Sequence, residues 1–222
     1  MRGVRVRIGV LTVVALALTA GAAWGEVVGR TTHPLEAPRA RVSESTLGDV
    51  VADAARSVME AQVALVQASQ IRATALPAGE LTREALEGAL LYPDERIVLV
   101  EMSGEMLLAA LERSVSVLPQ PSTGFLQVSG LAIRFRSEGT AGQRVESVRV
   151  GSGSLRNATT YRVAMPNSLA KGSLGYFRIF NGLEPVRTGP ALDEAVVGYV
   201  LATGTITITP GQRLEDLSAP RQ

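Results

Sequence analysis

The sequence predicts one α/β (α+β) domain, in which helices flank a mixed or largely antiparallel sheet. Three observations lead to this prediction. Apolar residues recur at helical spacing in several segments, short apolar runs separate these segments, and the period changes to two from Phe125 onward. The chain has 222 residues, of which 46% are hydrophobic, enough for one domain with a substantial core. Aromatic residues make up only 4%, so we expect a core of Val, Leu, Ala and Ile.

The chain divides into four predicted regions. Residues 1–25 combine three arginines, an apolar run and a small-residue cleavage site, which is typical of a secretory signal peptide. An uncleaved membrane anchor is the alternative, because the apolar run is close to the length of a short span. Residues 26–40 are interpreted as a linker or N-terminal arm, residues 41–211 as the folded domain and residues 212–222 as a loose tail. We therefore expect a periplasmic or secreted protein, with no membrane contact after signal cleavage.

Helices and buried strands are expected to alternate in the first half of the domain. Thr46 and Asp49 have capping-box spacing for the first helix, and Ser43 is a rival N-cap. The predicted elements are a helix over 43–62, a strand over 63–66, a helix over 81–90, a turn over 92–95, a strand over 96–102 and a helix over 104–117. The strand over 63–66 would point Gln67, Ser69 and Arg72 beyond its carboxyl end, where open α/β sheets bind ligands.

The second half has the pattern of an exposed sheet. Residues 131–136 and 145–150 alternate apolar and polar side chains, as a half-exposed antiparallel pair does. Further strands are predicted over 160–165 and 205–209, and a last helix over 191–203. The glycine-rich residues 151–154 lie between strands and are interpreted as a hairpin loop.

Several kinds of chemistry are excluded by composition. Without cysteine the chain has no disulfides, thiolate metal sites or thiol nucleophiles. Its one histidine, His33, lies in the predicted arm, so zinc and two-metal hydrolysis have no ligand set and a Ser-His-Asp triad has no well-placed base. Carboxylate-only chemistry stays open, but no pair stands out. We predict no catalytic residue and no metal ligand in this chain.

Charge and motifs narrow the range of partners. Loss of residues 1–25 leaves 19 basic and 21 acidic residues, which gives no basic excess for nucleic acid. No Gly-Lys-Ser/Thr sequence of a phosphate-binding P-loop occurs.

Five blocks, in order, resemble the C-terminal domain of 5′-nucleotidases. They are residues 41–54 (RVSESTLGDVVADA), 67–72 (QASQIR), 100–104 with 111–114 (VEMSG and LERS), 123–131 (TGFLQVSGL), and 161–170 with 172–176 (YRVAMPNSLA and GSLGY). The resemblance runs from about residue 41 to residue 209, nearly the whole predicted domain.

The resemblance implies a function. Complete members of this family are secreted two-metal nucleotide hydrolases, in which an N-terminal metallophosphatase domain carries the metals. Their C-terminal domain holds the nucleoside between two aromatic rings. The resemblance therefore implies a nucleotide- or nucleoside-recognition domain with no cofactor of its own. Divalent metals are expected only in a partner metallophosphatase chain, and we expect no hydrolysis by this chain alone.

The resemblance also implies site residues. Arg72 and Arg41 match arginines that face phosphate, Gln67 matches the base-facing residue, and Tyr176 matches one stacking aromatic. The family's other stacking aromatic comes from a Pro-Phe turn, and the Tyr92-Pro93 turn, in reversed order, makes Tyr92 a further candidate. Asn167, in the last block, is another substrate-binding candidate.

Each candidate has a structural alternative. Arg72 could be a surface arginine, Tyr176 a core aromatic, and Tyr92 and Asn167 turn residues. Two further hypotheses follow: a non-catalytic nucleotide-binding module, or a diverged structural or interaction domain. The second is favoured by Ser69, Gln70 and Leu174, which replace two glycines and an aspartate of the family pattern.

Overall fold

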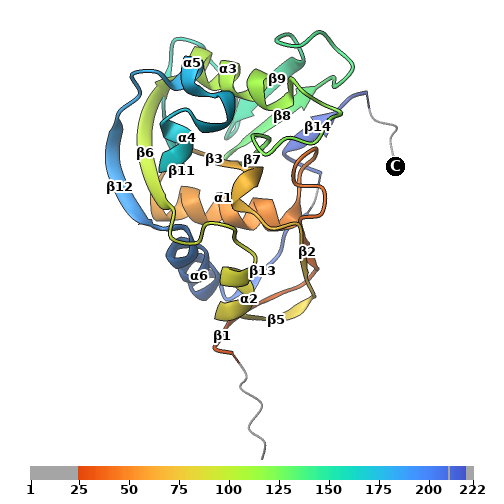
Figure 1. The fold of residues 1–222 in the computed structure, drawn as a ribbon, viewed down its shortest axis with the longest axis vertical. Helices are drawn as coiled ribbons and strands as arrows, with labels where there is room; N and C mark the ends of the chain where they lie inside the picture. The colour runs from red at the N-terminus through yellow and green to blue at the C-terminus, as the bar shows by residue number, and fades with distance from the viewer. Residues whose placement is uncertain (1–24, 210, 219–222) are drawn as a thin grey trace, which may run out of the picture.

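The computed structural model describes residues 25–209 and 211–218. Its main layer is a five-stranded mixed sheet of order β12-β6-β11-β3-β7, in which β3 and β11 are parallel and the other neighbours antiparallel. Helices α1 and α6 lie on one side of this sheet, and α3, α4 and α5 lie on the other (Figure 1). The predicted α/β class with a mixed sheet flanked by helices is confirmed.

The helices follow the apolar periodicity of the sequence. They are α1 (Thr46–Val58), α2 (Arg83–Gly88), α3 (Gly104–Val115), α4 (Asn167–Ala170), α5 (Phe177–Phe180) and α6 (Leu192–Thr203), with 3₁₀ turns η1 (Ala68–Gln70) and η2 (Ser173–Gly175). Thr82 caps α2, because its hydroxyl accepts a hydrogen bond from the Ala85 N–H at 3.2 Å. None of the helices among the described residues is long and apolar enough to cross a membrane.

The strands are β1 (Val27–Thr31), β2 (Leu35–Glu36), β3 (Val63–Gln67), β4 (Ala75–Leu76), β5 (Gly79–Thr82), β6 (Arg96–Ser103), β7 (Leu126–Ser129), β8 (Leu131–Phe135), β9 (Val145–Val150), β10 (Gly153–Ser154), β11 (Thr160–Pro166), β12 (Pro185–Ala191), β13 (Thr205–Ile206) and β14 (Leu214–Asp216). β3 is buried along its whole length, as expected for a central strand with an unbroken apolar run. β8 and β9 form the predicted antiparallel pair, and β10 continues that sheet beyond the 151–152 turn.

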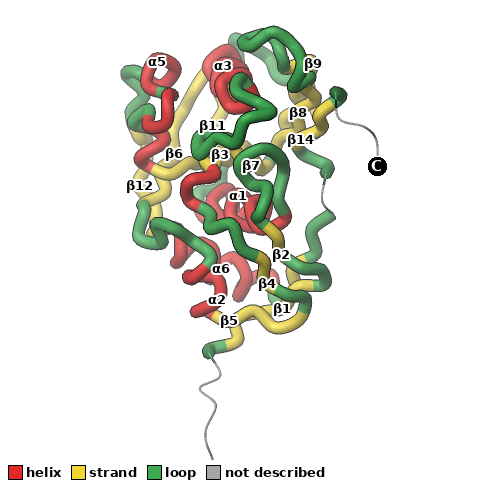
Figure 2. Tube along the Cα trace, turned by 45° about the vertical axis from the view of Figure 1, so that its right-hand side comes forward, coloured by secondary structure: helices red, strands yellow, loops and turns green. Residues whose placement is uncertain are grey.

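The interpretation of residues 26–40 as a linker is wrong. Val28, Thr31 and Leu35 are buried, and β1 pairs with both β13 and β5. β2 pairs with β4, beside this small sheet (Figure 2). The partners of β1 lie about 50 and 175 residues further along the chain, so local composition carried no sign of the pairing.

The predicted tail, residues 212–222, is also partly folded, since β14 pairs with β8. Hydrogen bonds and ion pairs of charged side chains connect this segment to α1 and to Glu44 just before it. Glu44 accepts hydrogen bonds from four consecutive backbone N–H groups, those of residues 211–214. Arg213 donates two 2.9 Å hydrogen bonds to the carboxylate of Asp53, and its Nε lies 3.5 Å from Asp49 Oδ1. Asp49 is fully buried, and burial raises its pKa to about 8 against the opposing effect of Arg213.

The start of α1 is held by one buried amide, that of Gln127 on β7. Its Oε1 accepts hydrogen bonds from the backbone N–H and the hydroxyl of Ser45, at 3.0 and 3.2 Å. Its Nε2 donates to the carbonyl oxygens of Ala40 and Ser43, both at 2.9 Å. The N-cap of α1 is therefore Ser45, whose hydroxyl accepts from the Gly48 N–H, rather than Ser43 or Thr46.

The predicted signal peptide, residues 1–25, lies outside the described residues apart from Gly25.

Candidate functional site

The candidate site lies where β3 and its parallel neighbour β11 end. Parallel strands bring their carboxyl ends to one edge of a sheet, so the residues after β3 meet those after β11. We define the β3 corner as residues 67–72, the turn 91–95 before β6, and residues 167–168 at the start of α4.

Hydrogen bonds tie the three parts of the β3 corner together. Gln67 Nε2 donates to Ser168 Oγ at 3.1 Å, and the Ser168 N–H donates to Glu95 Oε1 at 2.7 Å. The backbone N–H of Leu91 donates to the carbonyl oxygen of Gln70 at 2.8 Å. The corner is thus a connected polar structure on top of an apolar sheet.

Two side-chain amides of the corner are buried with unused hydrogen-bonding capacity. Gln67 and Gln70 are 1% and 2% exposed, and the Oε1 atom of each has no hydrogen-bond partner among the described residues. The hydroxyl of Ser173, which follows α4, is likewise buried without a partner in that part of the chain. A buried acceptor without a partner costs about 1–3 kcal/mol, so such groups mark places where a water or a ligand completes the structure.

Besides Gln67, four predicted site residues lie in or beside the corner. Arg72 is exposed and its Nε donates to the Gly88 carbonyl at 2.9 Å. Tyr92 is 56% exposed in the turn, and Asn167 opens α4. Arg41 is exposed, and its carbonyl accepts from the N–H of Ser122, next to the segment that pairs with η1.

Tyr176 occupies a different environment from the one the resemblance implies. It has no exposed surface, its hydroxyl donates to the Gly124 carbonyl at 2.7 Å, and its ring stacks on Phe180 at 5.5 Å between centroids. Burial raises the pKa of its hydroxyl. A ring enclosed in this way has no free face on which a ligand could stack. Tyr176 is therefore a core aromatic, which is the structural alternative given above for this residue. The exposed aromatic beside it is Phe177, at 63%.

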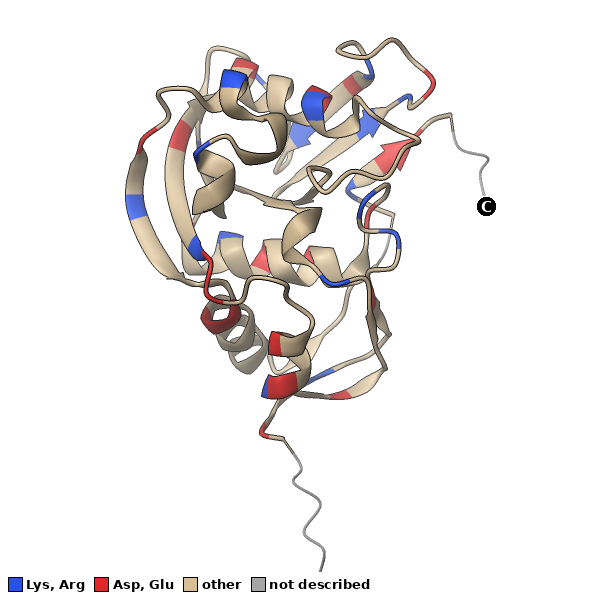
Figure 3. Ribbon diagram, viewed as in Figure 1, with Lys and Arg blue, Asp and Glu red and all other residues tan. Residues whose placement is uncertain are grey.

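Charged residues of both signs are spread over the fold (Figure 3). Within the part of the chain that the structure describes, no group of three or more His, Asp and Glu side chains is arranged to hold a metal ion. Positive charge at the β3 corner itself comes from Arg72.

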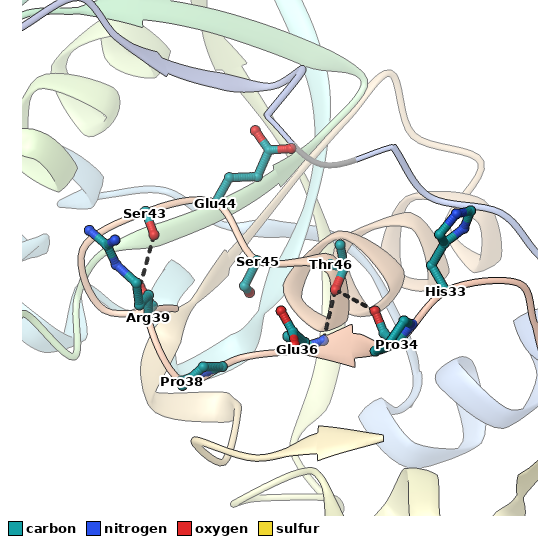
Figure 4. Close-up of a pocket in the computed structure, with 9 residues that line it drawn as sticks. All are labelled: His33, Pro34, Glu36, Pro38, Arg39, Ser43, Glu44, Ser45 and Thr46. Carbon is teal, nitrogen blue, oxygen red and sulfur yellow. Dashed lines mark hydrogen bonds between the residues drawn. The ribbon is translucent and has the colours of Figure 1, made fainter. Parts of the chain in front are cut away.

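A cavity of about 360 Å³ lies elsewhere, between the β2 segment and the start of α1 (Figure 4). His33, Arg39 and Glu44 are among its lining residues. Thr46 closes one wall by accepting from the Glu36 N–H at 2.7 Å and donating to the Pro34 carbonyl at 3.2 Å. None of the six predicted site residues lines this cavity, and the carboxylate of Glu44 is directed to the protein's own backbone.

Sequence reasoning missed Ser168, Glu95 and Ser173 as members of the corner or its surroundings. Glu95 lies in the turn that was predicted, and the other two lie in a block that resembles the family. Their roles depend on which strand ends meet, which the sequence does not state. Gln70 carried a signal, because it replaces a glycine of the family pattern.

Comparison with known proteins identifies the family. Residues 27–182 match the family described as 5′-nucleotidase, C-terminal domain. The chain is similar to Protein 5NUC of Lutzomyia longipalpis, 33% identical over 192 residues, which cover 75% of this chain and 33% of that protein. It is also 28% identical to an apyrase of Anopheles gambiae, over 83% of this chain and 33% of the apyrase.

Among solved structures, the 5′-nucleotidase precursor of Thermus thermophilus superposes with a TM-score of 0.79 at 30% identity, over 88% of this chain and 40% of that one. The Haemophilus influenzae NAD nucleotidase shares the fold, with a TM-score of 0.74 at 16% identity over 86% of this chain and 38% of that one. The chain spans about a third of the length of the two sequence relatives named above. It belongs to the 5′-nucleotidase C-terminal domain family.

Proposed function

We propose that this chain is the nucleotide-recognition part of a nucleotide-hydrolysing system and that the ligand binds at the β3 corner. The observation that carries the proposal is the pair of buried amide oxygens, on Gln67 and Gln70, that have no partner among the described residues. Nucleosides offer amino, ring N–H and hydroxyl donors that such acceptors can bind. The sequence relatives named 5′-nucleotidase and apyrase support a nucleotide as the ligand class.

Two exposed side chains supply the rest of a nucleotide site. The guanidinium of Arg72 can make charge-assisted, bidentate hydrogen bonds to a phosphate. The exposed ring of Tyr92 offers a stacking face, and stacking on an aromatic side chain stabilises a bound base by about 1–3 kcal/mol. Base and phosphate would then be held from two elements that the hydrogen bonds of the corner keep together.

Calorimetry with AMP, adenosine and a UDP-sugar tests the proposal. We expect heat with AMP, and Arg72→Ala should weaken AMP binding by about 10- to 100-fold while adenosine binding changes little, because only AMP carries the phosphate. Gln70→Leu should weaken both by about tenfold. Arg178→Ala, which removes another exposed arginine on α5, is the matched control and should leave both affinities unchanged. No heat with any ligand at millimolar concentration would contradict the proposal.

We further propose that the hydrolytic step takes place on a separately encoded metallophosphatase chain, in the periplasm or outside the cell. The proposal rests on the relatives named 5′-nucleotidase and apyrase, and on the described residues, which hold no group of His, Asp and Glu side chains arranged for a metal ion. The signal-peptide pattern of residues 1–25 supports the proposed location. Mixing the purified chain with metallophosphatase chains of the same genome should yield AMP hydrolysis that neither partner gives alone. Full AMP hydrolysis by this chain alone would overturn this assignment.

A second candidate is a diverged structural or interaction domain. The enclosed ring of Tyr176 favours it, because the resemblance implies a stacking role at that position. Under this alternative the ligands above give no heat and no partner restores hydrolysis, whereas the fold stays intact by circular dichroism.

A further inference from the structure

The segment 172–177, between α4 and α5, has an unusual backbone. Leu174 has φ 57° and ψ 28°, in the left-handed region that disfavours residues with a Cβ. Gly172 and Gly175 also have positive φ, at 84° and 90°. A branched residue stays in this conformation only where other contacts hold it there.

Two contacts hold the segment in place. Arg113 on α3 donates from Nη2 to the Leu174 carbonyl at 3.1 Å, and its guanidinium carbon lies 5.8 Å from the centre of the Tyr176 ring. The hydroxyl of Tyr176 donates to the Gly124 carbonyl at 2.7 Å. Gly175 accommodates the arginine, because a Cβ there would lie 2.5 Å from Arg113 Nη2.

The segment lies beside the β3 corner. Leu174 packs against Gly124, where a Cβ would lie 3.2 Å from the Leu174 carbonyl oxygen. Thr123, the residue before Gly124, accepts a hydrogen bond from the Ser69 N–H of η1 at 2.9 Å. Residues 123–124 therefore contact segment 172–177 on one side and Ser69 of the β3 corner on the other.

The held conformation leaves groups of the segment in poor environments. The Ser173 hydroxyl is buried with no partner among the described residues, while the apolar side chains of Leu174 and Phe177 are 36% and 63% exposed. A polar group inside and apolar groups outside are the reverse of the usual distribution. A second arrangement, with Ser173 turned outward, would correct the buried hydroxyl.

We infer that segment 172–177 is a lid beside the β3 corner, latched shut by Arg113 and by the hydroxyl of Tyr176. Opening breaks the two latch hydrogen bonds and gives a ligand that is bound at the corner access to the Ser173 hydroxyl. The identity of the ligand that the lid admits rests on the proposed function. The opening of the lid does not, because it can be measured on the chain without ligand. Since only the open form accepts ligand, the apparent dissociation constant is the intrinsic one divided by the fraction of time the lid is open.

Hydrogen exchange of the full chain without ligand tests the latch. Arg113→Ala should speed the exchange of backbone amides in residues 172–177 by about 3- to 30-fold, as expected for loss of a charge-assisted hydrogen bond. Nitration by tetranitromethane gives a second readout: Tyr176 should change from protected to reactive. Tyr92, exposed, should react in both proteins, and Tyr161, 6% exposed, should stay protected in both, which shows that the fold is intact.

Tyr176→Phe is the second variant, because it removes the other latch with little change of shape. It should also speed exchange in residues 172–177, by about 3- to 10-fold. Arg178→Ala is the matched control, since it removes an exposed arginine from the end of the segment, and it should leave exchange unchanged. Exchange at wild-type rates in both Arg113→Ala and Tyr176→Phe would overturn the lid.

AMP titration separates the failure of the lid from the failure of the proposed function. If both hold, Arg113→Ala binds AMP more tightly than wild type, by up to the factor gained in exchange. Faster exchange with no AMP binding by either protein supports the lid and overturns the proposed function. AMP binding by wild type with unchanged exchange in both latch variants supports the function and overturns the lid.

Discussion

Gln127 and Gln70 are both buried glutamines, yet the protein treats them in opposite ways. Gln127, at 0% exposure, uses its amide in four hydrogen bonds that hold the start of α1. Gln70, at 2% exposure, has an amide oxygen with no partner in the part of the chain that is described, and Gln67 beside it is the same. The protein itself supplies the hydrogen-bond partners of the Gln127 amide, whereas the amide oxygens of Gln67 and Gln70 have none among the described residues.

The difference separates polar groups that hold the fold from polar groups that are candidates for binding. Those at the start of α1 fix a helix, a strand and the C-terminal β14, so their loss should cost stability. Those of the β3 corner cost stability as they stand, because a buried acceptor without a partner is unfavourable. Four substitutions sharpen or break this contrast.

Arg213→Ala should have the largest effect. It removes both hydrogen bonds to Asp53 and leaves that carboxylate without its cation in a mostly buried position, which costs about 3–5 kcal/mol of unfolding free energy. Urea denaturation measures it. Arg134→Ala, which removes an exposed pair with Glu215 on the neighbouring strands, is the control and should cost about 1 kcal/mol or less. Equal losses in the two variants would mean that the ion pairs at α1 stabilise the fold no more than an exposed pair does.

Gln127→Leu should come next, with a loss of roughly 3 kcal/mol. The leucine has nearly the same volume, but it leaves the Ser45 N–H and the carbonyls of Ala40 and Ser43 unpaired. Urea denaturation with tracking of α1 by circular dichroism would show the loss. Unchanged stability of Gln127→Leu would show that the Gln127 amide does not hold the fold, and the contrast with Gln70 would fail.

Asp49→Asn should change the dependence of stability on pH. The pKa of Asp49 is about 8 in the folded chain, raised by burial and opposed by Arg213, with Glu44 and Asp53 as further acidic neighbours. Between about pH 4 and pH 8 the folded chain keeps a proton that the unfolded chain releases. The unfolding free energy therefore falls as pH rises, by up to about 1.4 kcal/mol per pH unit.

The asparagine variant lacks this titration, so its stability curve should be flatter across the same range. Asp94→Asn, an exposed turn residue, is the control and should keep the wild-type slope. Denaturation at pH 5, 6, 7 and 8 makes the measurement. A wild-type slope in Asp49→Asn would show that other groups carry the dependence.

Gln70→Leu should have the smallest effect on stability, and of the opposite sign. The substitution removes a buried oxygen that has no partner among the described residues, so the variant should be unchanged or more stable by about 1 kcal/mol. Thermal unfolding compares it directly with Gln127→Leu. A loss as large as that of Gln127→Leu would show that Gln70 is as structural as Gln127.

The sequence predicted most of the fold. The helices at 46–58, 83–88, 104–115 and 192–203 and the strands β3, β6, β8, β9 and β11 were expected within a few residues. β12 was missed because most of its residues are exposed and its sequence contains two prolines and a glycine. β1 and β14 were missed because distant partners, not local pattern, make them strands.

The site was predicted less well than the fold. Gln67, Arg72, Tyr92 and Asn167 do meet at or beside one edge of the sheet, because the order of strands in the family sets which ends meet. The resemblance implies a ligand role for Tyr176, whereas the structure encloses it. Whether an aromatic residue faces a ligand or the core depends on Leu174 and Arg113, whose contacts come from another helix and from a left-handed turn.

The pairing of β1 with β13 limits when the small sheet can form during synthesis. Arg30 and Thr31 align with Thr205 and Ile206, so β1 must wait for a strand about 175 residues further along the chain. Until then β1 has one edge without its partner, and unpaired edges favour association with other chains. The arrival of β13, rather than any local step, is therefore the event that completes this small sheet.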